Sequence, residues 1–217
     1  MMPGGVLQRF ARRGADASVA AAERCDLCSE PVPSEHRHLL ESTTRQLACV
    51  CQACSILFAQ PAASNGKYRL IPDRSVYLAD FALTDAEWAT LQVPVGMCFL
   101  VVTADARPLA FYPGPMGATE AAVDPSTWSA LRARFPLLAN MQPDVEALLV
   151  NRARGAREHY IVPIDTCFGL AGLIRTRWRG LSGGSEVWTE VGHFFEVLRK
   201  RSRIQRMEVT PCQPATT

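Results

Sequence analysis

Cys25-Asp26-Leu27-Cys28 and Cys49-Val50-Cys51-Gln52-Ala53-Cys54 decide how the N-terminal part of this chain folds. These two segments hold five of the eight cysteines. Two cysteines separated by two residues can bring both thiolates of one tight turn to the same metal ion, and a second such pair can complete a tetrahedral site. The pairs Cys25/Cys28 and Cys51/Cys54 therefore predict a zinc-ribbon-like module, which we place at residues 23–58.

Two further kinds of ligand lie in the same segment and leave the ligand set open. Cys49 comes two residues before Cys51, so on a strand both side chains point to the same face and Cys49 can replace Cys51 as a ligand. His36 and His38 also share one face if that segment is extended. We favour the four thiolates of the two cysteine pairs and keep His38 and Cys49 as alternative ligands.

The expected metal is Zn²⁺ in a structural role. Four thiolates close the coordination sphere of zinc and leave no position for a substrate. A run of about 30 residues cannot bury enough surface to fold by hydrophobicity alone, so the metal would supply the missing stability. Iron is the alternative, because four thiolates bind it as well and ligand type does not separate the two metals.

The composition indicates a folded protein without an obvious charged partner. The chain has 217 residues, of which 48% are hydrophobic and 20% charged, and its formal net charge is +2. We see no secretory signal and no apolar run of the roughly 20 residues that a membrane helix needs. We therefore expect a cytoplasmic protein, and in that reducing compartment clustered cysteines indicate a metal site rather than disulfides.

The remaining sequence predicts an α+β (mixed α/β) domain at residues 67–206, with a flexible arm at 1–22 and a disordered tail at 207–217. The run Met97–Val102 is apolar throughout, which indicates a strand covered on both faces. A loop is expected at 113–117, and Asp165 is expected to cap a helix. The other expected strands are 67–71, 76–78, 109–112, 145–151 and 158–162, with 145–151 equally open to a helical interpretation. The other expected helices are 84–91, opened by a capping box, 124–135, and 184 or 185 to 201.

No catalytic motif is recognisable in the sequence. His159 and His193 are the only histidines outside the cysteine-rich module, and neither belongs to a pattern with a nucleophile and an acid. Residues 175–206 contain eight basic and three acidic side chains. This excess fits a nucleic-acid surface, but cations are also stabilising at the C-terminal end of a helix. We favour the second explanation.

Two sets of motifs together resemble an uncharacterised bacterial family, found mainly in actinobacteria. The first set is Cys25-x-Leu27-Cys28, His36-x-His38-Leu39, Arg45-x-Leu47 and Cys49-x-Cys51-x2-Cys54-x2-Leu57-Phe58. The second set is Val162-Pro163-Ile164-Asp165, Gly172-Leu173-Ile174-Arg175, Trp178-Arg179-Gly180, Gly183-Gly184, Val187-Trp188 and Phe194-Phe195. The resemblance covers most of residues 24–200. Phe168 and Arg177 depart from the pattern, which has Tyr and His there, and neither departure touches the predicted metal ligands.

The resemblance implies a context for the protein, because genes of that family lie beside actinobacterial-type high-affinity nickel–iron hydrogenases. It suggests an accessory protein in hydrogenase maturation, assembly or electron-transfer coupling, with the Trp178-Arg179-Gly180 turn as a contact surface. The expected partner is a hydrogenase subunit or a maturation factor.

The leading hypothesis is thus a zinc-stabilised, non-catalytic accessory or adaptor protein. An iron-binding redox carrier, with the same four cysteines as ligands, is the second hypothesis. A zinc-ribbon nucleic-acid-binding protein is the third, and nucleic acid is the less expected partner. A metal-dependent hydrolase that uses His38 and an open zinc position ranks last.

Overall fold

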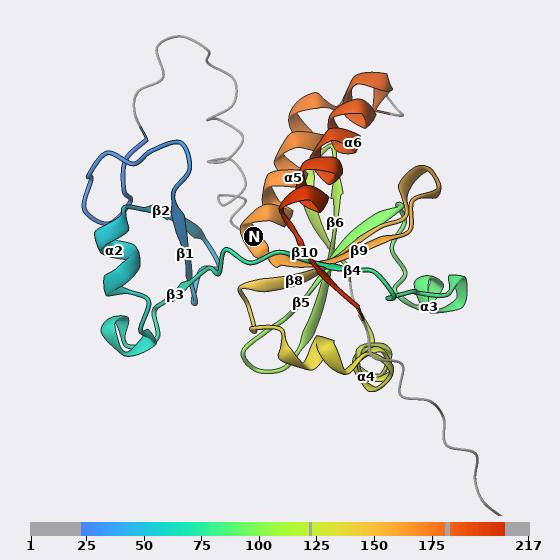
Figure 1. Cartoon of the computed structure of the whole chain (residues 1–217), viewed down its shortest axis with the longest axis horizontal. Coiled ribbons are helices and arrows are strands. Elements are labelled where there is room, and N and C mark those ends of the chain that lie inside the picture. The colour runs from blue at the N-terminus through green and yellow to red at the C-terminus, as the bar shows by residue number, and fades with distance from the viewer. Residues whose placement is uncertain (1–22, 122, 181–182, 207–217) are drawn as a thin grey trace, which may run out of the picture.

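The computed structural model describes residues 23–121, 123–180 and 183–206, and has two β-sheets with helices (Figure 1). The predicted arm at 1–22 and the predicted tail at 207–217 lie outside the described residues. The mixed α/β fold with a small N-terminal cysteine-rich unit is confirmed. Each helix in the described ranges is too short or too polar to cross a lipid bilayer.

The small unit is built on a three-stranded antiparallel sheet with the strand order β2-β1-β3. Its elements are β1 (Arg37–Glu41), β2 (Leu47–Val50), helix α2 (Gln52–Leu57), the short 3₁₀ helix η1 (Pro61–Ser64) and β3 (Tyr68–Leu70). Leu39 and Val50 are fully buried in its core together with three of the cysteines. β3 lies beyond residue 58, where the sequence placed the end of the module, yet it pairs with β1.

The larger unit has a seven-stranded sheet in the order β10-β4-β9-β8-β5-β6-β7. All neighbouring strands are antiparallel except β10 and β4. The strands are β4 (Val76–Leu78), β5 (Met97–Val102), β6 (Pro108–Gly114), β7 (Gly117–Ala121), β8 (Glu146–Asn151), β9 (Glu158–Pro163) and β10 (Arg203–Gln205).

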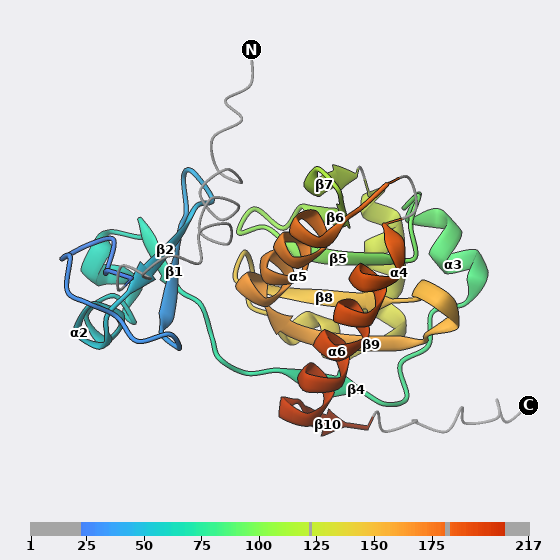
Figure 2. The same cartoon turned by 90° about the horizontal axis from the view of Figure 1, so that it is seen from above.

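Helices cover both faces of this sheet (Figures 1 and 2). Helices α5 (Ile164–Arg177) and α6 (Gly184–Arg201) pack on one face, and α3 (Asp85–Thr90), α4 (Pro125–Arg134) and the 3₁₀ helix η2 (Pro136–Asn140) lie on the other. Each face of the sheet has its own hydrophobic core. In β5, Phe99 packs into the core beneath α5 and α6, whereas Cys98 and Leu100 pack into the core beneath α4 and η2. Because alternate side chains enter different cores, an unbroken apolar run is what this strand needs.

The predicted starts of two helices are confirmed, and one segment that the sequence left open is a strand. Thr84 and Glu87 form the predicted capping box of α3, and Asp124 accepts a hydrogen bond from the Ser126 amide at the start of α4. The segment 145–151 is strand rather than helix, and it pairs with β9 around the short 3₁₀ helix η3 (Ala153–Gly155).

Two local predictions are wrong. The expected loop at 113–117 is mostly strand, since β6 runs to Gly114 and β7 begins at Gly117. Pro113 is tolerated because β6 pairs only with β7 beyond Phe111. Asp165 is not the cap of α5, because the helix begins one residue earlier, after Pro163.

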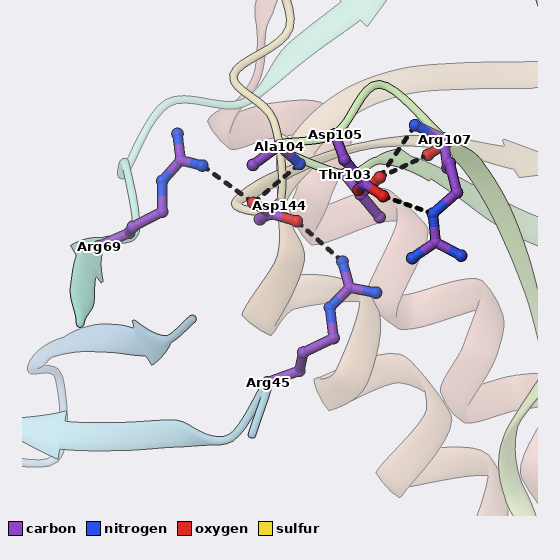
Figure 3. A network of polar contacts seen from close by, with 7 residues as sticks. All are labelled: Arg45, Arg69, Thr103, Ala104, Asp105, Arg107 and Asp144. Carbon is purple, nitrogen blue, oxygen red and sulfur yellow. Dashed lines mark hydrogen bonds and ion pairs between the residues drawn. The ribbon is translucent and has the colours of Figure 1, made fainter. Parts of the chain in front are cut away.

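Asp144 joins the small unit to the large sheet. Its carboxylate accepts hydrogen bonds from Arg45 at 2.8 Å and from Arg69 at 2.9 Å, and both arginines belong to the small unit (Figure 3). The turn between β5 and β6 adds a third donor, the Ala104 amide, at 3.2 Å. Asp144 is largely buried, with 11% of its side chain exposed, so one carboxylate orders three separate segments.

A second ion pair anchors the segment that links the two units. Arg74 lies in this linker and makes a bidentate contact with Glu146, through Nε at 2.5 Å and a terminal nitrogen at 2.8 Å. The Glu146 side chain is fully buried at the start of β8, and its carboxylate also accepts the Gln142 amide at 2.7 Å. A buried charge that is paired and hydrogen-bonded in this way is tolerated, whereas an unpaired one is not.

His159 is buried in β9 without a hydrogen-bond partner on either ring nitrogen. Its ring packs against Phe81, with the ring centroids 4.8 Å apart. Burial, together with the positive charges of Arg152 and Arg157, lowers the pKa of His159 to about 4. The folded protein therefore holds this imidazole neutral.

Replacing Asp144 tests the junction between the units. Asp144→Asn should lower the free energy of unfolding by about 1–3 kcal/mol, because two charge-assisted hydrogen bonds are weakened. Asparagine is the suitable replacement since Asp144 has a positive φ of 65°, which Asn also tolerates. Asp105→Asn, at an exposed partner of Arg107, is the matched control and should cost at most about 1 kcal/mol in denaturant unfolding. Equal losses in the two variants would contradict the role of Asp144.

His159 should make the protein less stable in acid. The unfolded chain takes up a proton near pH 6.5 and the folded chain only near pH 4, so stability falls as the pH drops below about 6.5. His159→Phe keeps an aromatic ring in place and removes the proton. Between about pH 8 and pH 5, wild type should lose about 2 kcal/mol more than this variant in denaturant unfolding. Parallel pH profiles would show that His159 has no part in acid sensitivity.

Candidate metal centre

The first cysteine pair lies in a short turn that precedes the small sheet. The Ser29 amide donates to the Cys25 carbonyl at 2.9 Å, and the Cys25 amide donates to the Glu30 carbonyl at 2.8 Å. Ser29 adopts a left-handed conformation, with φ of 65°, which lets the chain reverse directly after Cys28. Cys25 is buried and Cys28 is exposed, so the cluster reaches the surface on one side.

The second pair lies where β2 ends and α2 begins. Cys51 is the N-cap of α2, and its Sγ accepts a hydrogen bond from the Cys54 amide at 3.5 Å. A sulfur atom thus replaces the oxygen that usually caps a helix. This contact places Cys54 in the first turn of the helix, on the same side as Cys51.

Asp26 connects the two pairs through the backbone. Its amide donates to the Cys49 carbonyl at 2.8 Å, and its carboxylate accepts the Cys49 amide at 2.8 Å. The first turn is therefore held beside β2 by two hydrogen bonds that do not involve sulfur. Nothing in the cysteine spacing indicated this role for Asp26.

The structure brings Cys25, Cys28, Cys51 and Cys54 together, with all four Sγ atoms within 4.8 Å of one another. The Sγ atoms of Cys28 and Cys51 are 3.6 Å apart. In a tetrahedral zinc–thiolate site the bond length of about 2.3 Å gives sulfur–sulfur distances of about 3.8 Å. The cluster matches these dimensions, and the four thiols can bind a metal ion.

The electrostatics of the cluster are those of thiols crowded together. Burial opposes ionisation of Cys25, but hydrogen bonds with the backbone of Cys51, Cys28 and Leu27 outweigh it and lower the pKa of Cys25 to about 6. Burial and the neighbouring sulfur atoms raise the pKa of Cys54 well above its usual range. One thiolate forms readily, whereas further ones need a cation to offset their mutual repulsion.

The two alternative ligands lie elsewhere. His38 and Cys49 form a second group with His36, in which one ligand atom from each residue lies within 4.8 Å of the others. Cys49 does not take the place of Cys51, because Cys49 lies within β2 and Cys51 lies beyond its end. Sequence reasoning treated all these residues as competitors for one site, whereas the structure separates them into two clusters.

Asp165 is a functional candidate that the sequence did not reveal. Its carboxylate accepts a hydrogen bond from His38 Nδ1 at 2.8 Å, across 127 positions of sequence, and its other oxygen accepts the Thr166 amide at 2.7 Å. The contact joins β1 of the small unit to the start of α5. The only earlier signal was that both residues belong to the recurring motifs quoted above.

The comparison with protein families covers almost the same residues as those motifs. A family model described as a family of unknown function, DUF5947, matches residues 24–202. The chain belongs to this family. The expected membership of an uncharacterised family is thereby confirmed. Comparison with curated proteins and with solved structures gives no match. The matched range of the DUF5947 chain includes the cysteine cluster, His38 and Asp165, so both units belong to the family's fold.

The turn that the resemblance marked as a contact surface is held by internal contacts. Trp178 packs against Trp188 and donates from its indole nitrogen to the Gly180 carbonyl at 2.9 Å. Gly183 has φ of 87°, and a Cβ there would lie 2.9 Å from a methyl group of Val187. Close packing and a positive φ at the start of α6 thus explain why a glycine stands at position 183.

Loss of one cysteine should unfold the small unit. In Cys25→Ser we expect metal content to fall and residues 23–58 to become sensitive to protease, while the core of the seven-stranded sheet persists. Elemental analysis and limited proteolysis with mass spectrometry would measure both effects. Cys98→Ala, in the core of the large sheet and outside the cluster, is the control and should keep its metal. Unchanged metal and protease resistance in Cys25→Ser would contradict the assignment.

Proposed function

We propose that this protein is a zinc-stabilised, non-catalytic accessory or adaptor protein that presents its small unit to a protein partner. The observation that carries the proposal is the cluster of four Sγ atoms within 4.8 Å of one another. Four thiolates saturate a tetrahedral ion, so a metal held there has no position for a substrate and acts on the fold. We assign Cys25, Cys28, Cys51 and Cys54 as the zinc ligands.

The cluster supports a binding surface on α2. The helix is only six residues long and begins at the ligand Cys51, so the metal would fix its direction. Ile56 and Leu57 at its end are 64% and 59% exposed. Adjacent apolar side chains on a rigid support are suitable anchors for a protein partner, because their burial on binding releases water at little entropic cost.

The chain resembles a family whose genes lie beside nickel–iron hydrogenases, and this gene neighbourhood suggests the identity of the protein partner. We propose a hydrogenase subunit or one of the factors that mature or assemble the enzyme. Membership of a family of unknown function is consistent with this proposal and does not test it. A protein that works beside such an enzyme would act in the cytoplasm.

An iron-binding redox carrier is the second candidate. The observation in its favour is the exposure of Cys28, since electron transfer needs one edge of the metal site near the surface. The same four cysteines would be the ligands, and iron would replace zinc. Metal identity and colour separate the two candidates.

A nucleic-acid surface is less favoured, because several arginines of residues 175–206 already have partners in the fold. Arg177 pairs with Glu186 at 3.1 Å, and Arg201 approaches Glu35 at 3.5 Å. The Arg199 guanidinium lies 4.2 Å from the centre of the Tyr77 ring. These contacts, with the C-terminal end of α6, account for much of the basic cluster.

Copurification from native cells tests the adaptor proposal. We expect a hydrogenase subunit or maturation factor to be recovered with the wild-type protein and lost with Ile56→Glu/Leu57→Glu. Met116→Glu is the matched control, because Met116 is 82% exposed in the turn between β6 and β7. The control should keep the partner. Normal hydrogenase activity after deletion of the gene, with neither protein recovered, would contradict the proposal.

The metal is tested on protein purified without oxygen. Zinc without visible colour, lost from Cys25→Ser, is the expected result for the four-cysteine site. Iron with strong visible absorption, lost from the same variant, would instead establish the redox carrier.

A further inference from the structure

His36, His38 and Cys49 form a compact group on one face of the β1–β2 hairpin, which we call the histidine cluster. His38 and Cys49 are directly paired across the two strands. His36 precedes His38 by two residues, so its side chain falls on the same face in an extended segment. One ligand atom from each residue lies within 4.8 Å of the other two.

Each imidazole is oriented through Nδ1 by an oxygen outside the cluster. His36 Nδ1 donates to the Pro33 carbonyl at 2.8 Å, and His38 Nδ1 donates to the Asp165 carboxylate at 2.8 Å. A carbonyl oxygen and a carboxylate oxygen both accept, so each Nδ1 carries a proton, and a ring in its neutral form then has its lone pair on Nε2. This outer arrangement is the usual one for histidines that bind a metal through Nε2.

His36 Nε2 is the atom that lacks an explanation without a ligand. It is buried and makes no hydrogen bond of normal geometry to any residue that the structure describes, the Cys49 thiol being its neighbour, and only 6% of the His36 side chain is exposed. A buried acceptor of this kind destabilises the fold unless something occupies it. Cys49 beside it is also buried, with 4% exposed.

We propose that the histidine cluster is a second metal site, in which His36 Nε2, His38 Nε2 and Cys49 Sγ bind a divalent transition-metal ion and leave its fourth position open. Two imidazoles and one thiolate suit Zn²⁺, Co²⁺ or Ni²⁺ and do not suit Mg²⁺ or Ca²⁺. Asp165 is a positioning residue for His38. The site shares no ligand with the four-cysteine cluster, so its existence does not depend on the adaptor function.

The histidine cluster lies beside a cleft, although His36 Nε2 and Cys49 are themselves buried. His36, His38 and Asp165 line a cleft of about 510 Å³ that also reaches residues of α6, among them His193 and Arg201. Three protein ligands and one accessible position are typical of sites whose metal reacts or is exchanged, in contrast to closed structural sites.

Metal stoichiometry and cobalt spectroscopy test the site in the full chain. After saturation with Zn²⁺ and removal of excess, wild type should hold one equivalent more than His36→Gln or Cys49→Ser. With Co²⁺, wild type should gain visible absorption and a thiolate-to-cobalt band that Cys49→Ser lacks. Asp165→Asn should bind Co²⁺ about 10–100-fold more weakly, as expected for loss of an outer hydrogen bond to a ligand. His193→Gln, in the same cleft but outside the cluster, should behave as wild type.

The proposal is overturned if wild type takes up no metal beyond the four-cysteine site at millimolar Co²⁺. It is also overturned if a second equivalent binds but His36→Gln and Cys49→Ser leave its affinity unchanged. His36→Gln alters a side chain at the edge of the unit, and circular dichroism would show that its sheet is intact. His36→Gln and Cys49→Ser keep all four cysteines of the other site, so the zinc that these variants retain reports the four-cysteine site, and failure of one site is distinguishable from failure of the other.

Discussion

The approach of four sulfur atoms to within 4.8 Å of one another is the constraint on which the small unit depends. Four thiols at this separation do not all ionise unaided, because each thiolate raises the cost of the next and burial adds to it. The rise in the pKa of Cys54 expresses this cost. A divalent cation bound there would remove this cost and would fix the first turn against α2.

The small unit is attached to the larger one by charged and polar contacts, and by Leu40 of β1, which is buried in the large unit's core. Asp144 accepts Arg45 and Arg69, Asp165 accepts His38, and Glu146 holds Arg74 of the linker. Each of these acids belongs to the large unit, and each partner belongs to the small unit or to the linker. Directional contacts of this kind fix the orientation of the two units, while the burial of Leu40 and Ile71 in the large unit's core adds apolar contact.

Asp26 relates the two cysteine-containing clusters to each other. It lies between Cys25 and Cys28 and is hydrogen-bonded twice to the backbone of Cys49. The order imposed by the four-cysteine cluster thereby reaches the strand that carries one member of the histidine cluster. A closed site that shapes the unit and an open site on its surface would then have different tasks in one small sheet.

The sequence by itself determined the elements whose cause is local. The spacing of Cys25, Cys28, Cys51 and Cys54, the capping box of α3 and the apolar run of β5 each carry their own physical reason. The fold class followed from these patterns, as did the start of α4. Adjacent residues were sufficient because turns, caps and strand periodicity depend on neighbours in the chain.

Only the tertiary structure decided which ligands belong together and what the distant carboxylates do. The spacing favours Cys51 and leaves Cys49 as an alternative ligand, and the end of β2 at Val50 separates the two residues. Asp165 has the sequence of a helix cap, yet its partner His38 lies 127 positions away. The pairing of β10 with β4 was missed for the same reason. Contacts between remote segments depend on how whole layers pack, and no single stretch of sequence contains that information.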